Sequence, residues 1–440
     1  MTQLSHARSV APQAYAQVAV DRRVRYQTME GFGVNINPVG HWRGGSLKPV
    51  LDMLTGELGA TIFRFDPYGT CAWVGEEPPR LTPDALEAAY RGADFTDAWE
   101  TARYLLTRGA RILLNVSGPV PKWMCEPDGR TLRDTAAYVE LLTSLVRWYM
   151  TDEGLSLEWF GPFNETDIGP PEGPFISPEL ACDVLEQLDD RLTETVGRHV
   201  PLVAFDQARW GANYLFVLGG RPRARDAVDV VGMHCYTEVD HEAVANAVHD
   251  LQPKTGQWWL TEYGNLDRTG EIEWEVCWTS TERVLRALAA GASAALFWDA
   301  YDNWHRHEGG WTLYGLLRTA VRGPLYEYTR KKRFWAARHL YRFVPRSWQR
   351  VGTQCEGVLA VAFAGPLQEN GLTIVGMNED HEARLLSVEV ADDEQVEGPA
   401  RIFVTSEDLT NETLFEGEVA GHLRVRLPGR SVFTMTTCTD

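Results

Sequence analysis

The sequence predicts an α/β protein: a (β/α)8 TIM barrel followed by a small C-terminal antiparallel β-sandwich domain. Three observations predict this fold. Short apolar segments alternate with amphipathic segments of helical period up to about Val344. Beyond Val344 we expect no helix, because short alternating segments are separated by turns. The length of 440 residues also fits a barrel of about 250 residues or more with one smaller domain.

The barrel strands are expected where short apolar runs end abruptly at polar residues. Helical stretches with apolar residues at 3.6 spacing lie between them, as at Thr96–Arg108, Thr131–Tyr149, Pro178–Val196 and Ser280–Ala290. This repeated alternation favours a closed barrel over an open doubly wound sheet. The expected strands are Gly31–Asn35, Ala60–Arg64, Arg111–Val116, Ser156–Phe163, Leu202–Phe205, Val228–His234, Trp258–Thr261 and Ala294–Trp298.

The C-terminal region is expected to fold as a β-sandwich. Tyr15–Tyr26 alternates in the same way and is expected to add a strand to it. The predicted domains are therefore 27–344 for the barrel, and 1–26 with 345–440 for the sandwich. The strands expected after the barrel are Val358–Ala362, Leu372–Gly376, Leu385–Val390, Arg401–Val404 and Val432–Thr436.

Charge and composition narrow the range of partners. The net charge of −19 argues against nucleic acid and against an anionic membrane surface, whereas a neutral or positively charged partner fits. No secretory signal or membrane-spanning segment is visible, and the seven cysteines are scattered without metal-binding spacing. We expect a cytoplasmic protein, although a secreted protein that has lost its signal peptide would have the same sequence. The oligomeric state is left open.

Two glutamates end apolar strands of the predicted barrel. Glu165 follows the aromatic run Trp159–Asn164, and Glu262 follows Trp258–Thr261. Reactive residues of such barrels stand at the carboxyl ends of the strands, so both side chains would face one pocket from opposite sides. Each glutamate alone would also suit a helix cap or a salt bridge. Polar residues at the other strand ends are Asn35, Asn37, Arg64, Asp66, Asn115, Ser117, Asp206, His234, Tyr236 and Asp299.

A pair of carboxyl groups across one pocket is the equipment for cleaving a glycosidic bond with retention of configuration. One group must be protonated at rest and the other ionised, so their surroundings must differ. We expect Glu165 to be the acid/base and Glu262 the nucleophile. Arg64 would reach beneath Glu262 and lower its pKa, and Tyr236 would donate a hydrogen bond to the same carboxylate. Asn164 would contact the sugar 2-hydroxyl.

These motifs resemble those of the clan A glycoside hydrolases, which carry their two glutamates after strands four and seven. Family 30, the glucocerebrosidase, xylanase and galactanase group, is the most similar, with family 39 behind it. The resemblance implies a retaining mechanism and a non-proline cis peptide at Trp298-Asp299. Thr166 and Asp167 replace the family's usual proline after the acid/base pair, so no family member's substrate is carried over. The matching segments are Met29–Gly33, Arg64, Pro121–Met124, Asn164-Glu165, His234–Tyr236, Thr261-Glu262 and the last helix, Arg333–Val344.

Further residues are expected to line or support the pocket, and the partner is an oligosaccharide or glycoside. Aromatic and polar residues crowd the loop after strand eight, where barrel function resides. The hydrolase needs no metal and no cofactor. A metal-dependent sugar isomerase, with Asp66, His234, Glu262 and Asp299 as ligands, is the alternative, and a non-catalytic carbohydrate-binding barrel is another. The supporting residues are Asn35, Asp66, Trp123, His234, Trp298, Asp299 and Trp304.

Overall fold

The computed structural model describes residues 15–65, 81–251, 256–305, 308–323, 325–366, 371–391, 399–418 and 422–438. The chain divides into two compact units. One combines the N-terminal part up to Tyr26 with the residues from Trp348 onward, and the other spans Gln27–Ser347.

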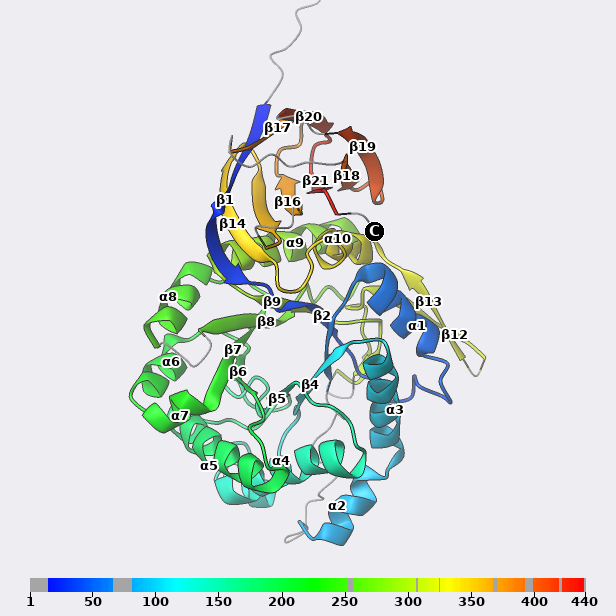
Figure 1. The fold of residues 1–440 in the computed structure, drawn as a ribbon. Helices are drawn as coiled ribbons and strands as arrows, with labels where there is room; N and C mark the ends of the chain where they lie inside the picture. Colours follow the sequence, from blue (N-terminus) through cyan, green and yellow to red (C-terminus); the bar gives the residue numbers. More distant parts are fainter. Residues whose placement is uncertain are drawn as a thin grey trace, which may run out of the picture. The chain divides into compact units, whose positions relative to one another are not determined.

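The Gln27–Ser347 unit is a (β/α)8 barrel. Within the described residues, eight parallel strands close into a ring in the order of the sequence (Figure 1). Each predicted strand has a counterpart, so the predicted barrel is confirmed. The strands are β2 (Gly31–Asn35), β3 (Ile62–Phe65), β4 (Arg111–Asn115), β5 (Trp159–Gly161), β6 (Leu202–Gln207), β7 (Val228–Cys235), β8 (Gln257–Tyr263) and β9 (Ala294–Phe297).

The strands form the barrel because nearly every side chain on them is buried. All residues of β2, β4 and β7 are buried, as expected of parallel strands enclosed on both faces. The rings of Trp159 and Trp259 meet edge to face inside the barrel, with their centroids 4.8 Å apart. The apolar cluster that contains them is Ile62, Leu113, Trp159, Val203, Val230, Trp259, Ala294 and Leu296.

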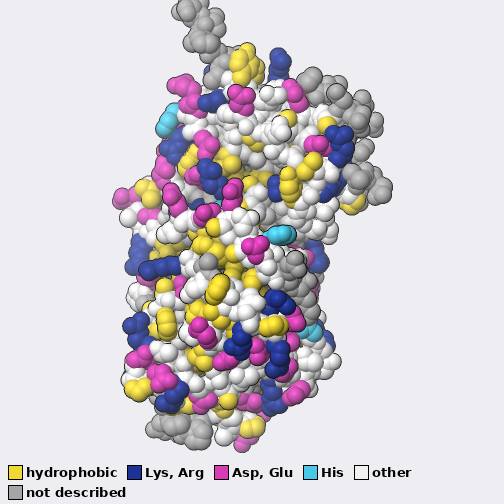
Figure 2. Space-filling view, turned by 90° about the vertical axis from the view of Figure 1, so that its left-hand side faces the viewer, with side chains coloured by type: hydrophobic (Ala, Val, Ile, Leu, Met, Phe, Trp, Pro, Cys, Tyr) yellow, Lys and Arg dark blue, Asp and Glu magenta, His cyan; other side chains and the backbone are white. Residues whose placement is uncertain are grey.

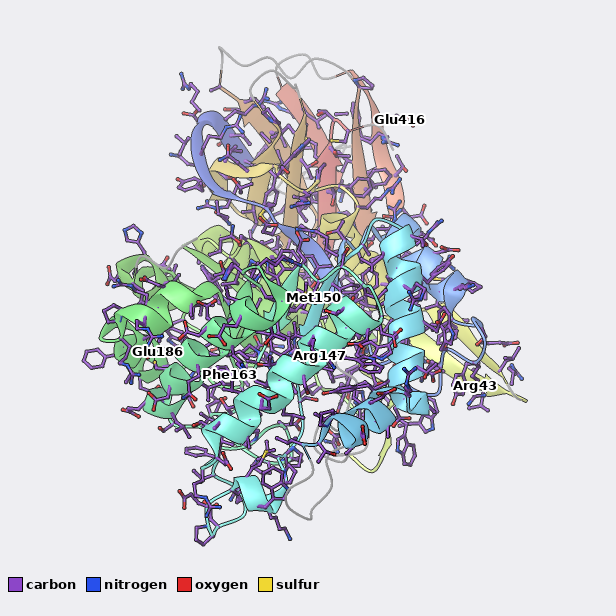
Figure 3. All side chains as sticks on the ribbon, turned by 60° about the horizontal axis from the view of Figure 1, so that its bottom comes forward. Arg43, Arg147, Met150, Phe163, Glu186 and Glu416 are labelled. Atoms are coloured by element: carbon purple, nitrogen blue, oxygen red, sulfur yellow. The ribbon has the colours of Figure 1, made fainter. Side chains whose placement is uncertain are left out.

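Helices surround the ring of strands. The predicted helix Pro178–Val196 is α5, whose N-cap Ser177 accepts a hydrogen bond from Leu180 N–H and whose C-cap Gly197 is left-handed. The other predicted helices are α3 (Ala93–Thr107), α4 (Thr135–Arg147) and α9 (Glu273–Ala290). Figure 3 shows α4 running without a break into the π-helical turn η3 (Trp148–Asp152), near the labelled Arg147 and Met150. The remaining helices are α1 (Lys48–Asp52), η1 (Met53–Leu58), α2 (Pro83–Tyr90), η2 (Lys122–Met124), α6 (Ala212–Gly219), α7 (Pro222–Ala227), α8 (His241–Leu251) and α10 (Lys332–Tyr341).

Two antiparallel ribbons follow β9, and the sequence analysis did not predict them. The first pairs β10 (Trp304–His305) with β11 (Gly310–Trp311). The second pairs β12 (Leu317–Arg322) with β13 (Leu325–Arg330), and it projects from the barrel (Figure 1). Both ribbons belong to the loop after strand eight, so they lie near the carboxyl ends of the barrel strands.

The second unit is a β-domain. Its nine described strands pair into one sheet in the order β19-β18-β21-β16-β15-β14-β1-β17-β20. The sheet is mostly antiparallel, as predicted, and β1 runs parallel to β17. The pairing is continuous, and the sandwich stays a prediction. The strands are β1 (Tyr15–Thr28), β14 (Gln349–Glu356), β15 (Leu359–Ala364), β16 (Leu372–Asn378), β17 (Arg384–Val390), β18 (Pro399–Thr405), β19 (Glu412–Glu418), β20 (His422–Leu427) and β21 (Ser431–Thr436).

The surface carries charges of both signs. On the face drawn in Figure 2, the Lys and Arg side chains lie interspersed with Asp and Glu rather than gathered into one basic area. Among the described helices, none is both long and apolar enough to cross a membrane.

Replacing Trp259 by alanine should destabilise the barrel. Trp259 is fully buried, contacts Trp159, and donates a hydrogen bond to Ser293 Oγ at 3.0 Å. Removing so large a buried side chain costs about 3–5 kcal/mol, which urea denaturation measures. Trp304→Ala is the control, because that side chain is 51% exposed and its loss should cost about 0.5 kcal/mol or less. Equal losses for the two variants would contradict the assignment of Trp259 to the barrel interior.

Candidate active site

Polar side chains from several strands meet at the carboxyl end of the barrel. Arg64 lies on β3, Glu165 follows β5, Asp206 lies on β6, His234 on β7 and Glu262 on β8. Arg64, Asp206, His234 and Glu262 are all buried. Because parallel strands end at the same rim, residues far apart in the sequence become neighbours here.

The guanidinium of Arg64 is the centre of this cluster. One terminal nitrogen donates to Glu262 Oε1 at 2.6 Å and to Asn35 Oδ1 at 2.7 Å. The other donates to Asn164 Oδ1 at 2.8 Å and to Asp206 Oδ2 at 2.9 Å. A guanidinium can be buried in this way because its fixed fork of donors is matched by carboxylate and amide oxygens. The predicted contact between Arg64 and Glu262 is present.

The two predicted glutamates lie close together, linked by His234. Nδ1 of His234 is 2.7 Å from Glu165 Oε1 and 3.3 Å from Glu262 Oε2. One carboxylate oxygen of Glu165 lies within 4.8 Å of one of Glu262. The hydroxyl of Tyr236 donates to Glu262 Oε2 at 2.5 Å, as predicted. The glutamates therefore face the same small space.

Burial and charge compete in setting the protonation of this cluster. Burial raises the pKa of Glu262, while the positive charges of His234 and Arg64 and the hydrogen bond from Tyr236 oppose that rise. The expectation of a lowered pKa for Glu262 is therefore wrong in direction, because the carboxylate is more completely desolvated than its strand-end position suggested. Burial lowers the pKa of His234, but the carboxylates of Glu262 and Glu165 outweigh it and bring the pKa to about 8.

A metal ion is the other species that these groups could hold. Glu165, His234 and Glu262 each offer one ligand atom, all within 4.8 Å of one another. The 2.7 Å between His234 and Glu165 is a hydrogen-bond distance, whereas two ligands of one tetrahedral zinc ion lie about 3.3 Å apart or more. Arg64 adds a fixed positive charge against Glu262. The geometry fits a shared proton better than a shared metal ion.

The backbone around Glu165 and Asp206 has an unusual conformation. Glu165, Phe205 and Asp206 have φ values of 48°, 82° and 41°, in the left-handed region that residues other than glycine rarely adopt. The N–H of Glu165 donates to Asp206 O at 2.9 Å, which ties the two segments together. Non-glycine residues held in this region concentrate at functional sites. The backbone conformation thus indicates a functional site at the position of the polar cluster, independently of the side chains.

A pocket opens directly above the cluster. Its volume is about 100 Å³. Five of the predicted site residues line it, whereas Arg64, Asn35 and His234 lie buried around it. The described residues that line the pocket are Ser117, Asn164, Glu165, Glu172, Tyr236, Glu262, Leu266, Trp298, Glu308 and Tyr314.

Glu172 is a third carboxyl group in the pocket that the sequence analysis missed. It follows Pro170-Pro171 in the loop after β5, where no strand or helix pattern draws attention to it. Burial, together with the charges of Glu165 and Glu262, raises the pKa of Glu172 to about 8. The only sequence signal would have been an acidic residue amid prolines and glycines, so close behind Glu165. Glu308 also lines the pocket, bound by Arg268 and by the hydroxyl of Tyr314.

The remaining predicted residues have mixed outcomes. Trp298 lines the pocket, and the predicted cis peptide between Trp298 and Asp299 is present. The carboxylate of Asp299 lies 3.4 Å from His305 Nε2 rather than facing Glu262. Trp123 and Trp304 are not among the described lining residues, and Trp304 is exposed on β10. Asp66 lies outside the described residues.

The sequence matches no family model and no curated protein, but solved structures match nearly the whole chain. A glycoside hydrolase family 30 subfamily 8 xylanase from Clostridium acetobutylicum is 18% identical, with a TM-score of 0.74 over 96% of this chain and 99% of that one. A family 30 endoxylanase from Clostridium papyrosolvens is 19% identical, with a TM-score of 0.76 over 96% and 100%. An endo-β1,6-glucanase is 17% identical, with a TM-score of 0.72 over 96% and 94%. The chain therefore has the fold of the family 30 enzymes, as the motifs predicted.

Gly232→Ala should lower the stability of the protein by displacing the carboxylate of Asp206. A Cβ at Gly232 would lie 2.0 Å from Asp206 Oδ1, so the carboxylate that binds Arg64 and Thr261 would have to move. Overpacking of this kind costs about 1–3 kcal/mol, measurable by thermal denaturation. Gly56→Ala is the matched control, because a Cβ there would meet nothing within 4 Å. Two variants of equal stability would show that Asp206 is not confined as described.

Glu172→Gln should change how stability depends on pH. The carboxyl has a higher pKa in the folded protein, about 8, than its ordinary 4.5, so folding favours the protonated form. The stability that this gives is complete below about pH 4.5 and is lost as the pH rises through about 8. The amide does not titrate, so the melting temperature of Glu172→Gln minus that of the wild type should increase over this range. If the difference in melting temperature did not depend on pH, the raised pKa would be contradicted. The control is Glu271→Gln, which makes the same substitution at an exposed position.

Proposed function

We propose that this protein is a retaining glycoside hydrolase, with Glu165 as the acid/base and Glu262 as the nucleophile. The observation that carries the proposal is the separation of the two carboxylates, of which one oxygen each lies within 4.8 Å of the other. Retaining enzymes hold these groups about 5–5.5 Å apart, whereas inverting enzymes need about 6.5–9.5 Å to admit a water molecule. The pocket above the pair gives a sugar ring access to both groups.

In the first step, Glu262 attacks the anomeric carbon. The bond from that carbon to the glycosidic oxygen breaks, and Glu165 transfers its proton to the departing oxygen, so the aglycone leaves as an alcohol. A covalent bond now joins the sugar to Glu262, and Glu165 is ionised. Charge thus moves from the nucleophile to the acid/base residue, with no cofactor in the step.

In the second step, Glu165 accepts a proton from water while the water oxygen attacks the anomeric carbon. The bond to Glu262 breaks, the sugar is released with its original configuration, and both carboxyls return to their starting states. The two inversions at the anomeric carbon account for the retention.

The neighbours of Glu262 suit a nucleophile. Arg64, His234 and Tyr236 all favour its ionised form and oppose the rise in pKa that burial causes. They also hold the side chain in one orientation, from Oε1 on one side and Oε2 on the other. A fixed nucleophile lowers the entropic cost of attack.

Asn164 is placed to contact the sugar. Its Oδ1 accepts from Arg64, and its Nδ2 donates to the carbonyl of Glu172 at 3.2 Å. An amide nitrogen carries two hydrogens, so a second donor remains for a ring hydroxyl. The adjacent indole of Trp298 on the pocket wall offers an apolar face to the ring.

The metal-dependent isomerase is less well supported. Of its expected ligands, Asp299 lies against His305, whereas His234 contacts Glu262. Arg64 places a fixed positive charge beside Glu262, one of the carboxylates that would have to bind the ion. A carbohydrate-binding barrel without activity would not need two glutamates that face one pocket, nor the residues that hold them there.

Hydrolysis of 4-nitrophenyl β-glycosides, screened over several sugars, tests the proposal. Glu262→Gln should lower kcat by about 10⁴-fold or more, and Glu165→Gln by about 10²–10⁴-fold, since an amide neither attacks nor donates the proton. Exposed Glu271→Gln should behave as the wild type. The first product seen by NMR should have the configuration of the substrate.

Three results would contradict the proposal. Inverted product would mean that a water molecule attacks directly. Full activity in Glu262→Gln would remove the nucleophile. Loss of activity with a chelator, restored by a divalent ion, would favour the metal-dependent alternative.

A further inference from the structure

Glu172 has no part in the two steps of cleavage, yet its carboxyl group lies on the wall of the pocket where they would occur. It is partly buried, and the charges of both Glu165 and Glu262 contribute to its raised pKa. A partly buried carboxyl group that is repelled by two others is costly, so such an arrangement calls for a role.

The position of Glu172 is fixed by its backbone. Its carbonyl accepts hydrogen bonds from Gly118 N–H at 2.8 Å and from Asn164 Nδ2 at 3.2 Å. Its own N–H donates to Gly169 O at 3.3 Å, and Gly169 N–H donates to Glu165 O at 3.1 Å. The backbone of this loop is thus hydrogen-bonded to Glu165 and to Gly118, which follows β4. Glu172 is therefore held in a built site rather than on a free loop.

The lining of the pocket is rich in carboxyl groups, and Arg64, His234 and Arg268 contact three of them from outside the lining. Four of its ten described lining residues are glutamates, and none of these ten is Lys, Arg or His. Carboxylates accept hydrogen bonds from sugar hydroxyls but repel a sugar carboxylate. The lining therefore suits a ring that presents hydroxyl groups.

The raised pKa of Glu172 indicates how the pocket responds to an added negative charge. Burial and the neighbouring carboxylates raise the pKa of Glu172 to about 8, so the pocket already disfavours one further charge. A uronic acid in the same space would bring its own carboxylate into the same surroundings. That carboxylate would bind with the same unfavourable free energy that disfavours the ionised form of Glu172.

We propose that Glu172 binds hydroxyl groups of the sugar ring in the pocket and selects a neutral glycone against a uronic acid. This inference rests on the proposed function and adds the class of sugar to it. The pocket is small, with a volume of about 100 Å³, which suits a single sugar unit better than a chain of them. Glu172 is then a specificity residue, and the chemistry stays with Glu165 and Glu262.

Paired substrates that differ only in the charge at C6 provide the test. The 4-nitrophenyl β-glucoside is compared with the β-glucuronide, and the β-galactoside with the β-galacturonide, using the wild type, Glu172→Gln and Glu172→Ala. The wild type should prefer the neutral member of the pair that it accepts. Glu172→Ala should raise KM for that substrate by about 10- to 100-fold with little change in kcat, because hydrogen bonds to the carboxyl group of Glu172 are lost.

The preference over the uronide should also fall about 10-fold or more in Glu172→Ala. Glu172→Gln keeps an acceptor oxygen, and below a pH of about 8 it has the same charge as the protonated carboxyl of the wild type. It should therefore retain much of the affinity for the neutral sugar, and it should accept the uronide better than the wild type only above that pH. Glu271→Gln changes the same charge on the exposed surface and should leave both constants unchanged. Circular dichroism and melting temperatures establish that each variant is folded.

Each outcome decides between the two proposals. A wild type that cleaves glycosides but accepts the uronide equally well would overturn the role of Glu172 and leave the hydrolase proposal standing. Unchanged KM in Glu172→Ala would do the same. A wild type that cleaves none of the substrates would overturn the proposed function, and this inference with it.

Discussion

The buried guanidinium of Arg64 is the interaction on which the rest of the site depends. It donates to Glu262, Asn35, Asn164 and Asp206, and so joins side chains from several barrel strands and from the loop that carries Glu165. Without it the buried carboxyl groups of Glu262 and Asp206 would lose their shared cationic partner, which is strongly destabilising. The same contacts orient Glu262 and set Asn164 beside Glu165. One cation thus supplies charge balance, orientation and spacing at once.

Much of the fold follows from local sequence signals. The barrel strands are apolar runs that stop at polar residues, and the structure has a strand at each of them. The helix Pro178–Val196 has the predicted bounds because Ser177, Pro178 and Gly197 mark its two ends chemically. The ribbons β10–β11 and β12–β13 were missed because they are short and lie within one long loop. The parallel pairing of β1 with β17 depends on a partner far along the chain, which no local pattern specifies.

The site was predictable where a side chain ends a strand and unpredictable elsewhere. Arg64, His234, Tyr236 and Glu262 were found because strand ends converge by geometry alone. Glu172 comes from a loop without periodicity, and its place depends on hydrogen bonds from Gly118 and Asn164. The pKa of Glu262 was predicted in the wrong direction, because its partners can be read from the sequence but the depth of its burial cannot.

A bulge in β8 decides which of its residues reach the site. The pairing of β8 with β7 slips between Met233 and His234, so the consecutive residues Thr261 and Glu262 both reach the barrel centre, one to Asp206 and one to Arg64. A regular strand would send one of them outward. Substitutions along β8 do not change which side chains point into the barrel. The deletion of one residue would turn every later side chain of the strand to the opposite face. The place of Glu262 in the site therefore depends on the number of residues that precede it on β8.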